Sequence, residues 1–150
     1  MSEAMAVQEY LYDAKGQITK TIDFGIDLRV STQTPVPPQG LRFNFDWQAD
    51  LAGSKLKGRI VGTNYAYTTA DGVSHVDSQG VLTTPEGDRI AVHTTGISTR
   101  KKDSPLFLQH ENISFFTGSE RYRWVNQVQA WGNGTVDLAT GRFEIKAYIA

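Results

Sequence analysis

The 150-residue chain contains no cysteine, no excess of either charge and no long apolar run. The absence of cysteine excludes disulfides, thiolate nucleophiles and cysteine-ligated metal centres. Fifteen basic and sixteen acidic residues nearly cancel, so the attraction that drives nucleic-acid binding is missing and we expect no such partner. No segment approaches the ~20 apolar residues of a membrane-spanning helix, and the first residues lack the features of a signal peptide. We therefore expect a cytoplasmic protein without a membrane partner.

Residues 1–150 are expected to form one domain, because a chain of this length builds a single core. Helical periodicity is nearly absent. Apolar and polar residues instead alternate between closely spaced turn residues, which is typical of antiparallel sheets. The clearest strand, residues 41–47, places Leu41, Phe43, Phe45 and Trp47 on one face.

The other expected strands are short and are joined by hairpins. A turn at residues 13–16 is expected to divide residues 7–21 into two strands, and residues 132–134 are expected to form another turn. Segment 31–40 contains three prolines and is expected to be a surface loop. Besides the strands already given, we expect strands at residues 22–30, 56–67, 73–84, 89–98, 113–116, 122–131 and 142–149. A total of eight to ten strands predicts an all-β fold, a single antiparallel up-and-down barrel.

Two expected strands carry polar side chains on faces that a solid core would need to be apolar. Residues 73–84 place His75 and Asp77 on one face, and residues 122–131 place Tyr122, Trp124 and Asn126 on one face. An eight-stranded barrel can enclose one small ligand, in a cavity that is largely aromatic with a few polar groups. The mixed faces therefore predict a small-molecule cavity.

Short runs between residues 22 and 148 resemble a known family of small bacterial and fungal barrels. The most specific are the Tyr-x-Trp-x-Asn run that begins at Tyr122 and the Asp-x-x-x-x-Leu-x-Thr-x-x-Gly pattern that begins at Asp77. Both are similar to the domain of unknown function 3237 family. The resemblance implies a calycin-like β-barrel with a cleft lined by Asp77, Tyr122, Trp124 and Asn126. It also implies a small oligomer, so a homodimer or higher homo-oligomer is a candidate assembly.

A carboxylate sheltered among aromatic rings has a raised pKa and can act as a general base. We expect Asp77 to take this role, with His75 as a second acid or base. Tyr122 and Asn126 are expected to hold an oxygen on which charge develops. The substrate is expected to contact further side chains, namely Trp124, Tyr65, Trp47, His93 and Asp50.

These roles predict a cofactor-free lyase or isomerase that abstracts a proton next to a carbonyl group of a small apolar or aromatic metabolite. The reaction would be an isomerisation, dehydration, cyclisation or retro-aldol cleavage. No metal site is expected, because His75, Asp77 and His93 lack tight ligand spacing. No motif for a Ser nucleophile or a phosphate-binding loop is present.

Two further classes stay open from the sequence. A non-catalytic barrel that binds a hydrophobic ligand would need a roomy apolar cavity with few titratable groups. A protein that only oligomerises through an edge strand would have no enclosed pocket. An enzyme would instead gather titratable groups at one point of the cavity.

Overall fold

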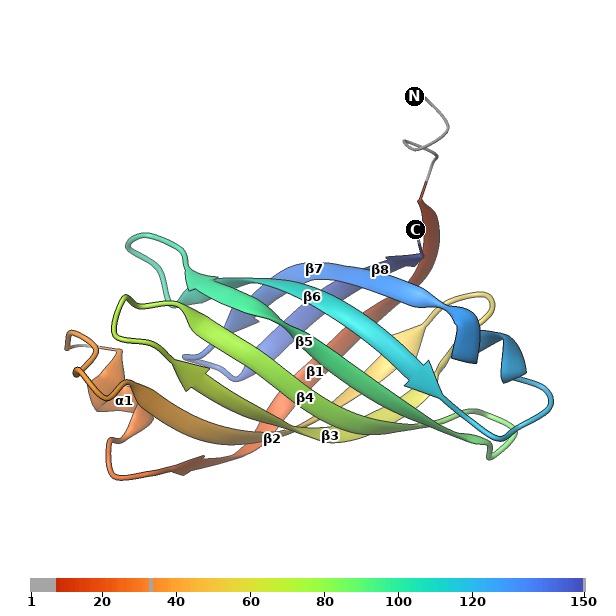
Figure 1. The fold of residues 1–150 in the computed structure, drawn as a ribbon, viewed down its shortest axis with the longest axis horizontal. Helices are drawn as coiled ribbons and strands as arrows, with labels where there is room; N and C mark the ends of the chain where they lie inside the picture. The colour runs from red at the N-terminus through yellow and green to blue at the C-terminus, as the bar shows by residue number, and fades with distance from the viewer. Residues whose placement is uncertain (1–7, 33, 150) are drawn as a thin grey trace.

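The computed structural model describes residues 8–32 and 34–149, which form a closed antiparallel barrel of eight strands (Figure 1). Each strand pairs with its neighbour in the sequence, and the first strand closes the barrel against the last. The predicted all-β up-and-down barrel is confirmed. The elements, in chain order, are β1 (Glu9–Asp23), α1 (Leu28–Ser31), β2 (Leu41–Ala52), β3 (Gly58–Thr68), β4 (Ser74–Thr83), β5 (Arg89–Arg100), β6 (Leu106–Phe116), the 3-10 helix η2 (Arg123–Gln127), β7 (Gln129–Asp137) and β8 (Arg142–Ile149).

Two predicted turns are wrong, because both segments lie inside long strands. The expected strand pair began at residue 7, which lies outside the described residues. Residues 13–16 lie in the middle of β1, where Gly16 pairs with Ala49 of β2 and with Phe143 of β8. Residues 132–134 lie inside β7, where Gly134 approaches the Glu144 carbonyl so closely that a Cβ would stand 1.8 Å from it. Glycine at these positions permits close strand packing rather than a reversal of the chain.

The prediction of a strand at residues 122–131 is wrong in its first half. Residues 123–127 form η2, and β7 begins only at Gln129. Val125 of η2 is fully buried in the main core cluster together with Tyr122. The 3-10 helix therefore closes one end of the barrel, and Tyr122, Trp124 and Asn126 do not share a strand face.

The segment between β1 and β2 covers the opposite end of the barrel (Figure 1). Residues 22–30 are not a separate strand, because β1 ends at Asp23 and the Asp27 carboxylate caps α1 by accepting a hydrogen bond from the Arg29 amide at 2.7 Å. The described residues of segment 31–40 contain no strand, as the prolines predict. Leu28 and Val36 of this cover pack on a second core cluster, which contains Leu41, Phe43, Phe45 and Ala66.

Strands β4 to β6 have a regular alternation of inward and outward side chains. On β4, Val76, Ser78 and Leu82 are buried, whereas Asp77 and Val81 are exposed. β6 begins at Leu106, seven residues before the strand that the sequence predicts there. Among the described residues, no helix combines the length and the apolar character needed to cross a membrane.

Candidate functional site

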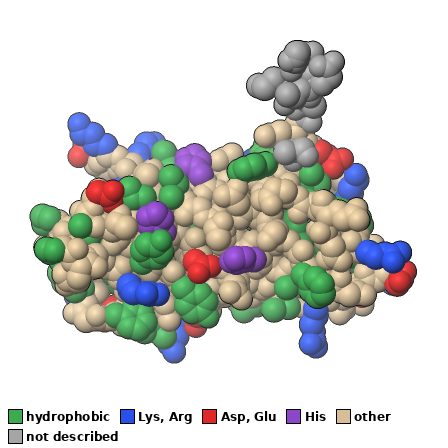
Figure 2. Space-filling view, viewed as in Figure 1, with side chains coloured by type: hydrophobic (Ala, Val, Ile, Leu, Met, Phe, Trp, Pro, Cys, Tyr) green, Lys and Arg blue, Asp and Glu red, His purple; other side chains and the backbone are tan. Residues whose placement is uncertain are grey.

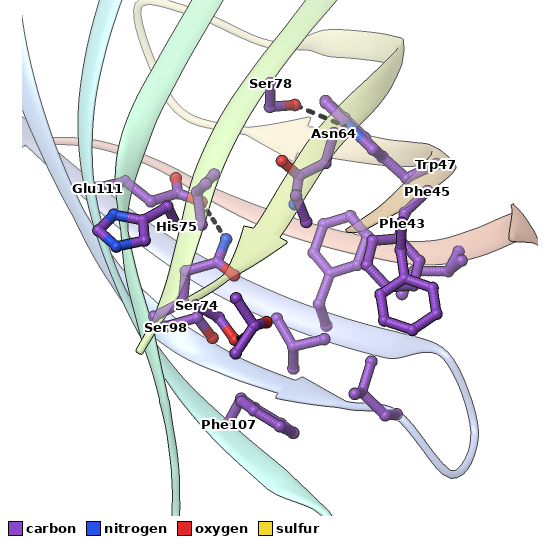
Figure 3. Close-up of a pocket in the computed structure, with 18 of the residues that line it drawn as sticks. Phe43, Phe45, Trp47, Asn64, Ser74, His75, Ser78, Ser98, Phe107 and Glu111 are labelled. Atoms are coloured by element: carbon purple, nitrogen blue, oxygen red, sulfur yellow. Dashed lines mark hydrogen bonds between the residues drawn. The ribbon is translucent and has the colours of Figure 1, made fainter. Parts of the chain in front are cut away.

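A cavity of about 350 Å³ lies inside the barrel and extends to the end that the α1 segment covers. Its floor is the main core cluster near η2, and side chains of the α1 segment, among them Leu28 and Val36, line the opposite end. Most of the side chains around it are apolar. The polar exceptions come from the α1 segment and from the adjacent strands β3 to β6, so the barrel wall around the cavity has two different sides (Figure 3).

One side is an aromatic wall, formed by Phe43, Phe45 and Trp47 of β2 and Phe143 of β8. The rings of Phe43 and Phe45 are stacked at 5.6 Å, and Trp47 meets Phe143 edge-on at 5.9 Å. The period-two alternation of β2 predicts this wall correctly for the three β2 residues. Aromatic rings provide a large apolar contact surface for a flat ligand.

Trp47 is held in one orientation by its neighbours on β3 and β4. Its indole N–H donates a hydrogen bond of 3.0 Å to the Ser78 hydroxyl. Its six-membered ring lies over Gly62 and Gly80, which pair with each other across the two strands. A Cβ on Gly62 would stand 2.8 Å from this ring, so the glycine is needed for the indole to lie flat on the sheet.

The other side is a polar wall on β4, β5 and β6. Cross-strand pairing aligns these side chains in rows: Ser74 with Ser98 and Gln109, and Ser78 with Thr94. The wall also includes Glu111, which pairs with Gly96 on β5 and with Gly132 on β7. The members of the polar wall are Ser74, Ser78, Thr94, Ser98, Gln109 and Glu111.

Glu111 is the acidic residue that faces the cavity from the polar wall. Its side chain retains some accessible surface because it borders the cavity. The Gln109 amide donates a hydrogen bond to its Oε2 atom. Burial raises the pKa of the Glu111 carboxyl to about 7, and the Gln109 hydrogen bond opposes this with a smaller effect. At neutral pH the carboxyl is therefore present in both protonation states, as a general acid or base requires.

Tyr12 of β1 provides a second proton-carrying group in the cavity. Its side chain is buried, and burial together with the charge of Glu111 raises the pKa of its hydroxyl above the usual range. The hydroxyl therefore remains a neutral phenol at physiological pH. Tyr12 can donate a hydrogen bond to a ligand oxygen while Glu111 exchanges a proton.

Gly132 makes room for the Glu111 carboxyl. A Cβ at this position would stand 3.1 Å from Glu111 Oε1 and 3.0 Å from Ile145 Cγ2. We expect Gly132→Ala to destabilise the protein by about 1–3 kcal/mol, because overpacking a filled interior displaces side chains. Urea denaturation measures this change. The matched control is Gly118→Ala, where nothing lies within 4 Å of the added Cβ; equal stabilities of the two variants would contradict the close fit.

The structure places Asp77 and His93 outside the cavity. Their side chains are each 52% exposed, and His93 Nε2 lies 3.1 Å from Asp77 Oδ1 on the outer face of the barrel. The expected shelter of Asp77 among aromatic rings is therefore wrong. Tyr65 is also exposed on the outside, and Asp50 forms an ion pair of 3.4 Å with Arg59 there. The error arises from the choice of face, since Ser74, Val76 and Ser78 of the same strand point inward.

Tyr122, Trp124 and Asn126 lie at the closed end of the barrel and are absent from the cavity lining. The Tyr122 hydroxyl donates to Glu86 at 2.7 Å, and the Asn126 amide bonds both the N–H and the carbonyl of Thr117. Trp124 packs against the main core cluster. In this structure the hydrogen bonds of Tyr122 and Asn126 hold η2 and the neighbouring loops in place.

Two of the predicted site residues do reach the cavity. Trp47 belongs to the aromatic wall, and His75 lies among the residues around the mouth. The His75 ring stacks on Tyr67 at 4.6 Å, and Tyr67 is exposed. The described residues contain no group of three or more histidine or acidic side chains that could hold a metal ion.

Sequence reasoning missed Glu111, Gln109 and Tyr12. The signal for the first two was present, because Phe107, Gln109, Glu111, Ile113 and Phe115 alternate with polar or exposed residues as one strand face. The predicted strand began only at Ile113, so Gln109 and Glu111 were excluded from it. Tyr12 was missed because its strand was expected to end in a turn at residues 13–16.

Comparisons with known proteins give a family and a fold. The model of a family described as "Protein of unknown function (DUF3237)" matches residues 21–150. The hydroalkoxylation enzyme phnH from Penicillium herquei is 29% identical over 83 residues; the match covers 55% of this chain and 49% of that enzyme, about half its length. A protein of unknown function from Clostridium acetobutylicum ATCC 824 has a TM-score of 0.78 at 15% identity, with 97% of this chain and 99% of that one covered. An enzyme from Penicillium herquei has a TM-score of 0.59 at 21% identity, covering 97% and 96%.

Proposed function

The chain belongs to the DUF3237 family of proteins of unknown function, and we propose that it is a cofactor-free acid–base enzyme. In this proposal Glu111 catalyses the addition of the O–H bond of a substrate hydroxyl across a carbon–carbon double bond. The reverse reaction is an elimination, so the same site serves a lyase or a cyclase. The observation that carries the proposal is the Glu111 carboxyl, with a pKa of about 7, beside an apolar cavity.

The chemistry requires one group that both gives and takes a proton. The protonated Glu111 transfers its proton to one alkene carbon, and a new C–H bond forms. The substrate hydroxyl oxygen bonds to the other alkene carbon, and its proton passes to the Glu111 carboxylate. Glu111 thus ends in its initial state, and no oxidant or reductant is consumed. A pKa near the working pH serves both transfers.

The surroundings of Glu111 suit this reaction. The aromatic wall faces the polar wall across the cavity, so a flat substrate held against the rings presents its edge to Glu111. The Gln109 amide fixes one carboxyl oxygen, and the Tyr12 phenol can donate to an oxygen of the substrate.

The relative from Penicillium herquei supports this choice of reaction among those that a buried carboxyl can perform. It is a hydroalkoxylation enzyme by name, and hydroalkoxylation is the addition of an O–H group across a double bond. The proposal narrows the lyase or isomerase class expected from the sequence and moves the general base from Asp77 to Glu111.

A small model substrate tests the proposal. 1-Allyl-2-naphthol carries a hydroxyl group and an alkene on one flat ring system, and its cyclisation gives a methyl-substituted dihydrofuran. We expect the protein to accelerate this cyclisation and, in D₂O, to place one deuterium in the new methyl group. Chromatography with mass spectrometry measures both. Binding of the compound without any product would favour the alternative function, a non-catalytic barrel for hydrophobic ligands.

A further inference from the structure

We propose that the cavity contains a second oxygen-binding site, formed by Ser98 and Ser74, and that its ligand is a flat, uncharged ring system with two oxygen functions on one edge. The inference rests on the proposed function only in placing the first oxygen beside Glu111. The second site lies nearer the mouth of the barrel, in the row of the polar wall that joins β4, β5 and β6.

The Ser98 hydroxyl is the central observation. Ser98 is buried, with 7% of its surface exposed, and it lines the cavity. The hydrogen bonds found among the described residues include none from this hydroxyl. Among the described residues, the buried side-chain atom without a hydrogen-bond partner is Asp88 Oδ2, so the Ser98 hydroxyl is open to the cavity and not sealed from it. A ligand oxygen that enters the cavity can therefore form a hydrogen bond with this hydroxyl.

Ser74 extends the site on the neighbouring strand. It pairs directly with Ser98 across β4 and β5, and Figure 3 shows the two side chains next to each other on the same side of the cavity as Glu111. The Ser74 hydroxyl shares one hydrogen bond of 2.9 Å with Thr68. Two hydroxyls that share one hydrogen bond keep one further donor, so Ser74 and Ser98 together can both donate to and accept from a ligand.

The register fixes the spacing between the two oxygen functions. Glu111 pairs with Gly96, and Ser98 lies two residues further along β5. Two residues of a strand span about 6.6–6.8 Å and neighbouring strands lie about 4.8 Å apart, so the two sites are roughly 8 Å apart along the diagonal. The stacked Phe43 and Phe45 rings belong to the facing wall. A ligand that satisfies both sites is therefore flat and carries oxygens at opposite ends of one edge, as a fused bicyclic diol does.

The charges near the mouth indicate that this ligand is neutral. Arg100 is the arginine in the described lining, and its guanidinium donates hydrogen bonds to the carbonyls of Thr32 at 2.7 Å and Ser104 at 3.4 Å. These two bonds direct the Nε and Nη1 atoms of Arg100 to the backbone. A carboxylate or phosphate would find the hydroxyls of Ser74 and Ser98 there, which carry no charge to balance it.

The test compares two probes that differ in one hydroxyl, 2-naphthol and 2,7-dihydroxynaphthalene, whose two hydroxyls lie at opposite ends of one edge. Isothermal titration calorimetry should show that the wild-type protein binds the diol about five- to tenfold more tightly, as expected for one additional hydrogen bond. In the double variant Ser74→Ala, Ser98→Ala the difference should shrink to less than twofold, while the affinity for 2-naphthol stays unchanged. The control Thr95→Ala, on the exposed face of β5, should keep the preference.

Each other outcome overturns the inference. These outcomes are equal affinities of the two probes for the wild-type protein, absence of binding, or a full preference for the diol in the double variant. If the double variant does not fold, the single variant Ser98→Ala gives the same comparison. The wild-type protein separates the two proposals, because a preference for the diol in a wild-type protein that does not cyclise 1-allyl-2-naphthol supports the second site and contradicts the proposed function.

Discussion

Replacement of Glu111 by glutamine is expected to lower the rate of 1-allyl-2-naphthol cyclisation by about 10²–10⁴-fold, the usual contribution of a general acid or base. Glutamine keeps the size and one hydrogen-bonding oxygen of the side chain but cannot give or take the proton. Binding of the substrate should therefore be retained. Measurement of initial rates at saturating substrate, together with calorimetric binding, separates loss of chemistry from loss of the site.

The matched control is Asp77→Asn, which removes a carboxylate from the outer face of the same barrel. Asp77 is half exposed and interacts with His93, so its replacement should leave the cyclisation rate within about twofold, as for most surface substitutions. A large loss of rate in Asp77→Asn with a normal rate in Glu111→Gln would reverse the placement of the site.

The stability of the protein is expected to fall as the pH rises from about 4.5 to 7. Burial raises the pKa of Glu111 from 4.5 to about 7 in the native state, whereas the unfolded chain keeps the lower value. Between these two values the native state binds more protons than the unfolded state, so raising the pH favours unfolding. A shift of this size corresponds to roughly 3 kcal/mol in favour of unfolding above pH 7.

The Glu111→Gln variant removes this contribution and should unfold less readily than the wild-type protein at pH 8. The free energy of unfolding of Glu111→Gln minus that of the wild-type protein should be about 3 kcal/mol larger at pH 8 than at pH 4. Urea denaturation at both pH values measures this difference. Glu144 is exposed on β8, so Glu144→Gln is the control. Its stability relative to the wild-type protein should not change between pH 4 and pH 8. Parallel pH profiles of wild-type and Glu111→Gln proteins would contradict a buried, titrating Glu111.

The strand pattern predicts the barrel because period-two alternation and hairpin turns are local features of the sequence. The aromatic wall follows from the same rule, since Phe43, Phe45 and Trp47 alternate with polar residues. The turns at residues 13–16 and 132–134 were predicted wrongly, because a glycine signals either a reversal or a close approach of strands. Only the partner strands, which come from distant parts of the chain, decide between the two.

The site was harder to predict than the fold for a related reason. On β4 both faces carry polar side chains, and which face points inward depends on the register with β3 and β5. A shift by one residue exchanges Asp77 for Ser78. Glu111 acquires its raised pKa from burial, which is a property of the closed barrel rather than of any short motif.

The most direct test of the account is an NMR titration of the side-chain carboxyl carbon of Glu111, assigned by its absence in Glu111→Gln. The account predicts a midpoint near pH 7, in agreement with the value of about 7 that burial gives to this carboxyl. A midpoint at about 4.3, the ordinary value for glutamate, would contradict it, because the carboxyl would then be fully ionised at neutral pH and unable to donate a proton.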